Sequence, residues 1–96
     1  MEASEVKLYE APYVYGMRAV AYFTGINASV FYEDADDWDG ATEDALESLC
    51  EKAAAAGANS VVGLEITCDP FAVNEKGDTG LRVSVIGTPV VLEALY

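Results

Sequence analysis

Two cysteines, Cys50 and Cys68, are the side chains of this 96-residue chain best suited to bind a soft metal ion, because the chain has no histidine. Structural zinc takes about four thiolate or imidazole ligands. A helix ending near residue 56 and a strand over 60–68 would place Cys68 on the order of 10 Å beyond Cys50, outside the ~7 Å Cα limit of a disulfide. We therefore predict reduced thiols and weak metal candidates. Cys50 would fill the core, and an assembly could bring copies of Cys68 together.

An acidic stretch over residues 33–40 is a second candidate, because carboxylates bind calcium. An EF-hand loop starting at Asp34 needs oxygen ligands at its third and fifth positions and a glutamate at its twelfth. Asp36 satisfies the third position, but Trp38 and Ala45 occupy the fifth and twelfth. The motif fails, so the stretch is predicted to be a solvated linker that leads into a helix.

The residue sets of common catalytic sites are missing from the sequence. There is no histidine to act as a base, no Gly-x-Ser-x-Gly elbow and no glycine-rich phosphate loop. Glu65 is best explained as an ion-pair partner of Arg82, across two strands or between subunits. We predict that the protein is not an enzyme and that it has no cofactor.

The charge balance argues against two classes of partner. The chain has 17 acidic and 5 basic residues, a net charge of −12. Such a surface would repel phosphate backbones and anionic lipids, so neither nucleic acid nor a membrane is an expected partner. The start, MEASEVKLYE, does not resemble a signal peptide, and no apolar run approaches the roughly 20 residues of a membrane span. We expect a cytoplasmic protein in which residues 1–96 form one domain.

The helix that carries Cys50 is predicted over residues 42–56. Asp39 or Thr42 suits its N-cap, and Gly57 suits the left-handed position that closes a helix. The chain must then reverse at once into the strand over 60–68. The helix would present one apolar stripe to the core, made of Leu46, Leu49, Cys50 and Ala53.

Three more strands are predicted over 14–23, 28–32 and 81–93, and the last pairs with 60–68 as a hairpin across a loop at 69–80. Gly63 would mark the close approach of another group. Gly87 and Pro89 should make the last strand bulge or leave the sheet. Alternation in the strand over 60–68 would place four side chains on one face, namely Val62, Leu64, Ile66 and Cys68.

The strand over 14–23 carries apolar side chains at both odd and even positions, so both of its faces need cover. The chain has little left to cover the outer face, and this predicts a homo-oligomer. Tyr13, Tyr15 and Tyr22 would lie at the interface or line a ligand channel. The fold class is α+β, a two-layer β-α-β-β arrangement with one amphipathic helix on a mostly antiparallel sheet.

The helix, the corner and the last strand together resemble the YbjQ-like family of heavy-metal-binding domains. The corner motif is Gly57-Ala58-Asn59-Ser60-Val61-Val62-Gly63, the strand motif is Gly87-Thr88-Pro89-Val90, and Phe23-Thr24-Gly25 matches an earlier turn. The chain departs from the family in a shortened linker before the helix, in Thr42 near the place of an arginine and in Pro89 in place of alanine. The resemblance implies a dodecin-like fold that assembles into a ring, typically a pentamer.

Two functions remain open from the sequence. The first is a small intracellular binding or scaffolding module whose principal partner is itself, in a homo-oligomeric ring. The alternative is a stress-related protein that binds a metal ion or a small ligand, as the family description implies. The residues singled out as corner motif or interface are Gly57, Asn59, Gly63, Gly87, Thr88, Tyr13, Tyr15 and Tyr22.

Overall fold

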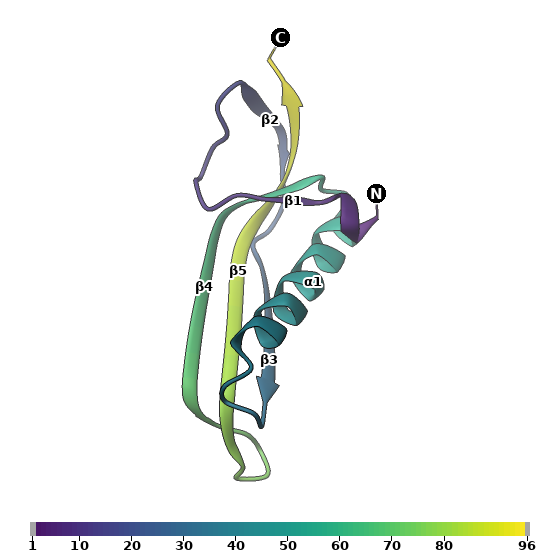
Figure 1. Cartoon of the computed structure of the whole chain (residues 1–96). Helices are drawn as coiled ribbons and strands as arrows, with labels where there is room; N and C mark the ends of the chain where they lie inside the picture. The colour runs from purple at the N-terminus through teal and green to yellow at the C-terminus, as the bar shows by residue number, and fades with distance from the viewer. Residues whose placement is uncertain (1, 96) are drawn as a thin grey trace.

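Two long strands, β4 (Ser60–Val73) and β5 (Thr79–Ala94), form an antiparallel hairpin that runs the length of the molecule (Figure 1). The computed structural model describes residues 2–95 and measures 51 × 22 × 20 Å. The strands β2 (Met17–Tyr22) and β3 (Ile26–Tyr32) follow one another along the outer side of β5, both antiparallel to it. The α+β class and the mostly antiparallel sheet are thereby confirmed.

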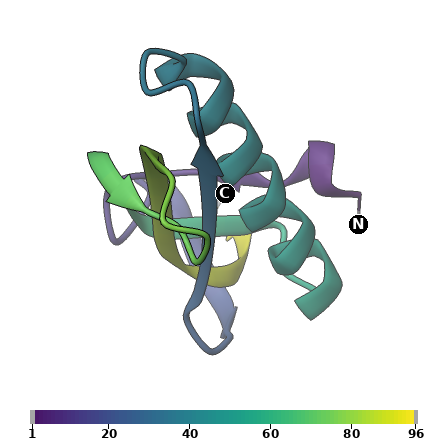
Figure 2. The same ribbon diagram turned by 90° about the horizontal axis from the view of Figure 1, so that it is seen from below.

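The N-terminal segment adds elements that the sequence analysis did not predict. A short 3-10 helix, η1 (Ala3–Glu5), precedes β1 (Lys7–Leu8), which pairs with β4 in parallel. The sheet is therefore mixed, in the order β1-β4-β5 with β2 and β3 on the far side of β5. The single long helix, α1 (Trp38–Ala56), crosses one face of this sheet diagonally (Figures 1 and 2).

The helix begins four residues earlier than predicted. Its N-cap is Asp37, whose Oδ1 accepts a hydrogen bond from the backbone N–H of Gly40 at 3.1 Å. The prediction of Asp39 or Thr42 was wrong, because both lie inside the helix and Asp37 already satisfies a free N–H of the first turn. Side chains four residues apart form the buried stripe, and all but Leu49 are alanines, which lets the helix approach the sheet closely: Ala41, Ala45, Leu49 and Ala53.

The predicted alternation of β4 is wrong at its start, because a β-bulge separates Val62 from Glu65. Gly63 in the bulge has a positive φ of +65°, and a Cβ built on it would meet nothing within 4 Å. Glycine is thus required there by the backbone conformation, not by a close neighbour. The bulge places Leu64 against the helix-side core and Val62 in a second cluster on the opposite face.

The expected loop over 69–80 is mostly strand. β4 continues to Val73, and the hairpin turn is confined to the residues between Val73 and Thr79. The side chain of Asn74 organises this turn, since its Oδ1 accepts hydrogen bonds from the N–H groups of Lys76 and Asp78 at 3.0 and 2.9 Å. Pro70 is tolerated because β4 is an edge strand at this level.

Strand β5 runs without interruption through Gly87 and Pro89, against the prediction. Pro89 lies opposite Val61 of β4, and its carbonyl accepts a hydrogen bond from Phe23 N at 2.9 Å. The nitrogen of a strand residue points to the same side as its carbonyl. The N–H that Pro89 lacks would therefore have pointed at the connection between β2 and β3, where no strand pairs with β5. No hydrogen bond of the sheet is lost at this position.

We expected the face of the sheet away from the helix to be apolar. The structure shows that it is apolar only in part. At its upper end the chain covers itself, because Tyr9 and Val14 pack on the cluster of Val62, Val90 and Leu92. The lower half is mainly polar, and its hydroxyls include the Ser29–Ser84 pair at 2.7 Å. Its polar side chains are Asn27, Ser29, Glu65, Thr67, Asp69, Arg82 and Ser84.

Candidate functional site

The corner after the helix is a structural joint. Gly57 adopts φ 95°, its N–H donates to Ala54 O at 3.0 Å, and the N–H of Ala58 donates to Ala53 O at 3.0 Å. These bonds satisfy the last carbonyls of the helix and reverse the chain, as predicted for Gly57.

Asn59 connects this joint to the end of β5. Its side-chain amide donates to Leu92 O and accepts from Leu92 N, both at 2.8 Å, and its backbone N–H donates to Val90 O at 3.1 Å. Its carbonyl accepts from Lys7 N at 3.1 Å. Asn59 thus joins β1, through its carbonyl, to β5, through its side chain and its N–H.

Among the glycines of the predicted motifs, Gly87 is required by a close neighbour. A Cβ built on it would collide with Cγ1 of Val61, which is fully buried in β4. The next residue, Thr88, is half-buried and lies opposite Val62. Four of the five residues of the corner and strand motifs singled out from the sequence therefore have structural roles in the fold, and nothing in the structure explains the fifth, Thr88.

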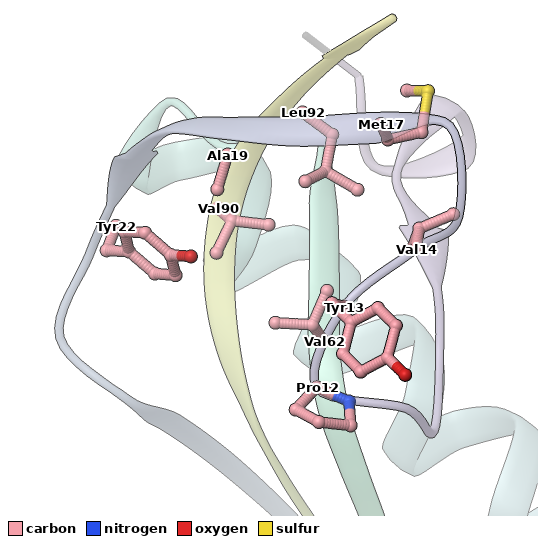
Figure 3. Close-up of a pocket in the computed structure, with 9 residues that line it drawn as sticks. All are labelled: Pro12, Tyr13, Val14, Met17, Ala19, Tyr22, Val62, Val90 and Leu92. Carbon is pink, nitrogen blue, oxygen red and sulfur yellow. The ribbon is translucent and has the colours of Figure 1, made fainter. Parts of the chain in front are cut away.

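An apolar pocket lies at the upper end of the face away from the helix (Figure 3). Its floor is formed by Val62, Val90 and Leu92, and two exposed rings, Tyr13 and Tyr22, stand at its sides. The free space is about 30 Å³, which is room for roughly one water molecule and far less than a drug-sized ligand occupies. The residue Tyr15, which is 93% exposed, does not line it.

The lower half of β4 carries apolar side chains that the chain itself leaves uncovered. The helix packs over β3 and β5 and barely contacts β4 (Figure 1). Ile66 is 42%, Phe71 82% and Val73 55% exposed. We call these three residues the β4 stripe. The sequence analysis assigned Phe71 and Val73 to a loop, and the signal that could have placed them was the continuation of β-branched and aromatic residues past Pro70.

Comparison with known proteins identifies the family. A family model described as "Putative heavy-metal-binding" (YbjQ) matches residues 14–93. The chain belongs to the YbjQ family. It is also 35% identical over 102 residues to a UPF0145 protein of Trichodesmium erythraeum (strain IMS101), an alignment that covers 96% of this chain and 92% of the relative.

The fold of this YbjQ-family chain has a solved counterpart. A crystal structure of a protein of unknown function from Pediococcus pentosaceus ATCC 25745, a member of the DUF74 family, superposes with a TM-score of 0.63. The match covers 92% of this chain and 98% of the other, at 19% sequence identity. At that identity the likeness concerns the fold alone.

The description of the YbjQ family directs attention to the two thiols. Both are free and half-buried, and the structure places Cys50 on the helix beside η1 and Cys68 on β4 opposite Val83. Burial, and to a lesser extent the charge of Glu47, raises the pKa of the Cys50 thiol, which disfavours the thiolate that a metal needs. Within residues 2–95, no three side chains of the metal-binding types lie together.

The acidic stretch of this YbjQ-family chain caps and flanks the helix. Asp37 is the N-cap, and Asp34 Oδ1 accepts a hydrogen bond from Asp36 N at 3.0 Å. Tyr32 donates a short hydrogen bond to Asp44, and this bond is the main reason why the pKa of Tyr32 rises to about 12.

Two further expectations can be compared with the structure. Arg82 faces Asp69 and lies over the ring of Phe31, whereas Glu65 lies opposite Ile86, so the expected Glu65–Arg82 cross-strand pair is not formed. The ion pair that residues 2–95 do contain joins Arg18 to Glu93, with Nε donating to Oε1 at 2.8 Å. In the same part of the chain, no helix combines the length and apolar character of a bilayer-spanning segment.

Proposed function

We propose that this YbjQ-family protein is a non-enzymatic binding or scaffolding module that acts as a homo-oligomeric ring, with the pentamer expected from the family resemblance. The observation that carries the proposal is the β4 stripe. It continues the main core at the edge of the sheet, because Leu64 and Cys68 of the same strand pack against that core. A second copy on this edge would complete the core.

The distribution of charge supports an arrangement in which sheets meet and helices face outward. Nine of the 17 acidic residues lie between residues 33 and 51, a segment without lysine or arginine that leads into and forms most of the helix. The polar half of the opposite face has only three charged side chains, Glu65, Asp69 and Arg82. Association through the sheet edge would keep the acidic helices apart and exposed to solvent.

Sedimentation velocity of the full chain at micromolar concentration tests the proposal. A species several times heavier than 10.2 kDa is expected. The variant Phe71→Ser with Val73→Ser should shift the distribution toward the single chain, because it removes most of the apolar area of the β4 stripe. The matched control is Tyr15→Ser, an exposed aromatic residue outside the stripe. A wild-type protein that sediments only as one chain would overturn the proposal.

The alternative function, binding of a metal ion or a small ligand, is favoured by the family description and by the two free thiols. In this case function would reside in the thiols. Calorimetric titration with zinc, copper and calcium, on wild type and on Cys68→Ser, separates the two functions. Heat that is lost in Cys68→Ser would support metal binding, whereas the absence of heat in wild type would leave scaffolding as the proposal.

A further inference from the structure

Resting on the proposed self-assembly, we propose which surfaces meet: the free edge of β3 in one copy pairs in parallel with the lower edge of β4 in the next. The contact is heterologous, since two different edges of the same sheet come together. The backbone groups that each edge leaves open, the strand directions and the position of the helix support this contact.

The upper part of the β4 edge is already covered by the chain itself. Lys7 N donates to Asn59 O at 3.1 Å and Tyr9 N to Val61 O at 2.9 Å, while Leu64 N donates back to Tyr9 O at 3.0 Å. Leu64 therefore directs its backbone groups away from β5. We call a residue outward when its backbone N–H and C=O point away from β5. Outward residues alternate along a strand with residues whose backbone groups point toward β5, so the next outward residues are Ile66 and Cys68. Within residues 2–95, no strand lies beside them.

The open part of the β4 edge ends a few residues further on. Asp69 Oδ1 accepts a hydrogen bond from Phe71 N at 3.0 Å, and Pro70 has no N–H to donate. Both features prevent strand pairing. The edge that remains free for another strand therefore centres on Ile66 and Cys68.

The free edge of β3 has a matching pattern. Lys52 Nζ donates to Asn27 O at 2.6 Å, so Asn27 is an outward residue whose carbonyl is already occupied. Alternation makes Ser29 and Phe31 the next outward residues. Each edge is thus protected at its upper end and offers two outward residues below. β2 offers a poorer edge, because its pairing with β5 is interrupted between Ala19 and Ala21.

The direction of the strands and the position of the helix agree with this pairing. Both β3 and β4 are antiparallel to β5, so they run the same way. A second copy placed beside β4 with its helix on the same side of the sheet therefore adds β3 in parallel. Its helix packs over its own β3, which brings the helix next to the β4 stripe of the first copy. The repeated contact extends the sheet from copy to copy, and a heterologous contact of this kind forms a ring where the rotation between copies closes.

A disulfide between Ser29→Cys and Thr67→Cys tests the pairing, in a background with Cys50→Ala and Cys68→Ala. Both residues lie opposite Ser84 on its two sides. Within one chain they are therefore two strands apart, about 9.6 Å, which exceeds the ~7 Å Cα limit of a disulfide. Between copies paired as proposed they lie on adjacent strands and on the same face.

After mild oxidation, the double variant should shift from one chain to a ladder of two and more chains on a non-reducing gel. Each single variant should stay at one chain, because a heterologous contact does not bring like residues together. A second pair, Asn27→Cys with Glu65→Cys, lies one step along the same strands and opposite Ile86, and serves if the first pair does not fold.

The outcomes separate this inference from the proposed function. Suppose that the variants sediment as oligomers under reducing conditions, but neither cysteine pair gives a ladder after oxidation. This result would overturn the β3–β4 contact and leave self-assembly standing. Dimers that form with a single variant indicate a symmetric edge contact and also overturn it. A reduced protein that sediments as one chain removes both proposals.

Discussion

The side chain of Asn59 forms two hydrogen bonds of 2.8 Å with the backbone of Leu92, one to its carbonyl and one from its N–H. These two hydrogen bonds join the corner after the helix to the last strand, 33 positions away in the sequence. The same residue lies in the corner motif by which the chain resembles its family. Its position is explained by the fold, without any ligand.

Replacing this asparagine should therefore destabilise the protein. We expect Asn59→Ala to lower the free energy of unfolding by about 2 kcal/mol, since two partly buried backbone groups lose their partners at about 1 kcal/mol each. Urea unfolding followed by circular dichroism measures the change. Asn27→Ala, an exposed asparagine with no side-chain hydrogen bond among the described residues, is the control. A loss below about 0.5 kcal/mol, the usual range for surface substitutions, would contradict the assigned role.

Replacement by alanine should lower the free energy of unfolding at Gly87 but hardly change it at Gly25. A Cβ at Gly87 would collide with Val61, whereas a Cβ at Gly25 would have only one neighbour, Gly87 O, at an ordinary 3.7 Å. We expect Gly87→Ala to cost about 2 kcal/mol, as overpacking of a core does, and Gly25→Ala to be nearly neutral. Combining Gly87→Ala with Val61→Ala should recover part of the loss, which a double-mutant cycle by urea unfolding would reveal. Strict additivity would argue against the contact.

Self-association should strengthen as salt is added. Each copy has a net charge of −12, so copies repel one another at low ionic strength, and the Debye length falls from about 30 Å at 0.01 M to about 3 Å at 1 M. Sedimentation at 20 mM and 500 mM sodium chloride compares the two regimes. Dissociation at high salt would instead indicate that attraction between opposite charges holds the copies together.

Tyr32 should titrate well above the ordinary pKa of a tyrosine. The hydrogen bond to Asp44 is the main cause that raises the pKa of Tyr32 to about 12. Because the folded pKa lies above the ordinary value of about 10, the stability that Tyr32 contributes is complete below pH 10 and is lost as the pH rises through about 12. Absorbance at 295 nm follows the titration, and Asp44→Asn should move this step toward pH 10. A wild-type curve that is complete near pH 10 would contradict the bond.

Local patterns in the sequence predicted the helix, its end at Gly57 and the hairpin that follows. They worked because each rests on a few neighbouring residues: a four-residue apolar spacing, and a glycine that accepts a positive φ of 95°. The prediction of the N-cap was wrong because several acidic residues precede the helix, and any of them could accept a hydrogen bond from an N–H of the first turn. In the structure the role falls to Asp37, and the first buried residue of the helix, Ala41, follows four positions later.

Errors in the strands have a different origin. Gly63 was expected to mark a close approach and Pro70 to lie in a loop, yet Gly63 forms a bulge and Pro70 lies on an open edge, so both belong to one strand of 14 residues. Whether a proline or glycine ends a strand depends on which side its neighbours occupy. That information is absent from the order of residues along the chain.

The amino-acid order alone determined the class of the fold, the acidic character and the corner between helix and strand, because propensity, charge and turn chemistry act over a few residues. Only the tertiary structure decided which apolar side chains stay uncovered. The expected apolar outer face is largely polar or covered by residues 9–16, and the exposed stripe lies instead on β4. The reason is physical: exposure depends on where the helix rests on the sheet, and it rests on β3 and β5.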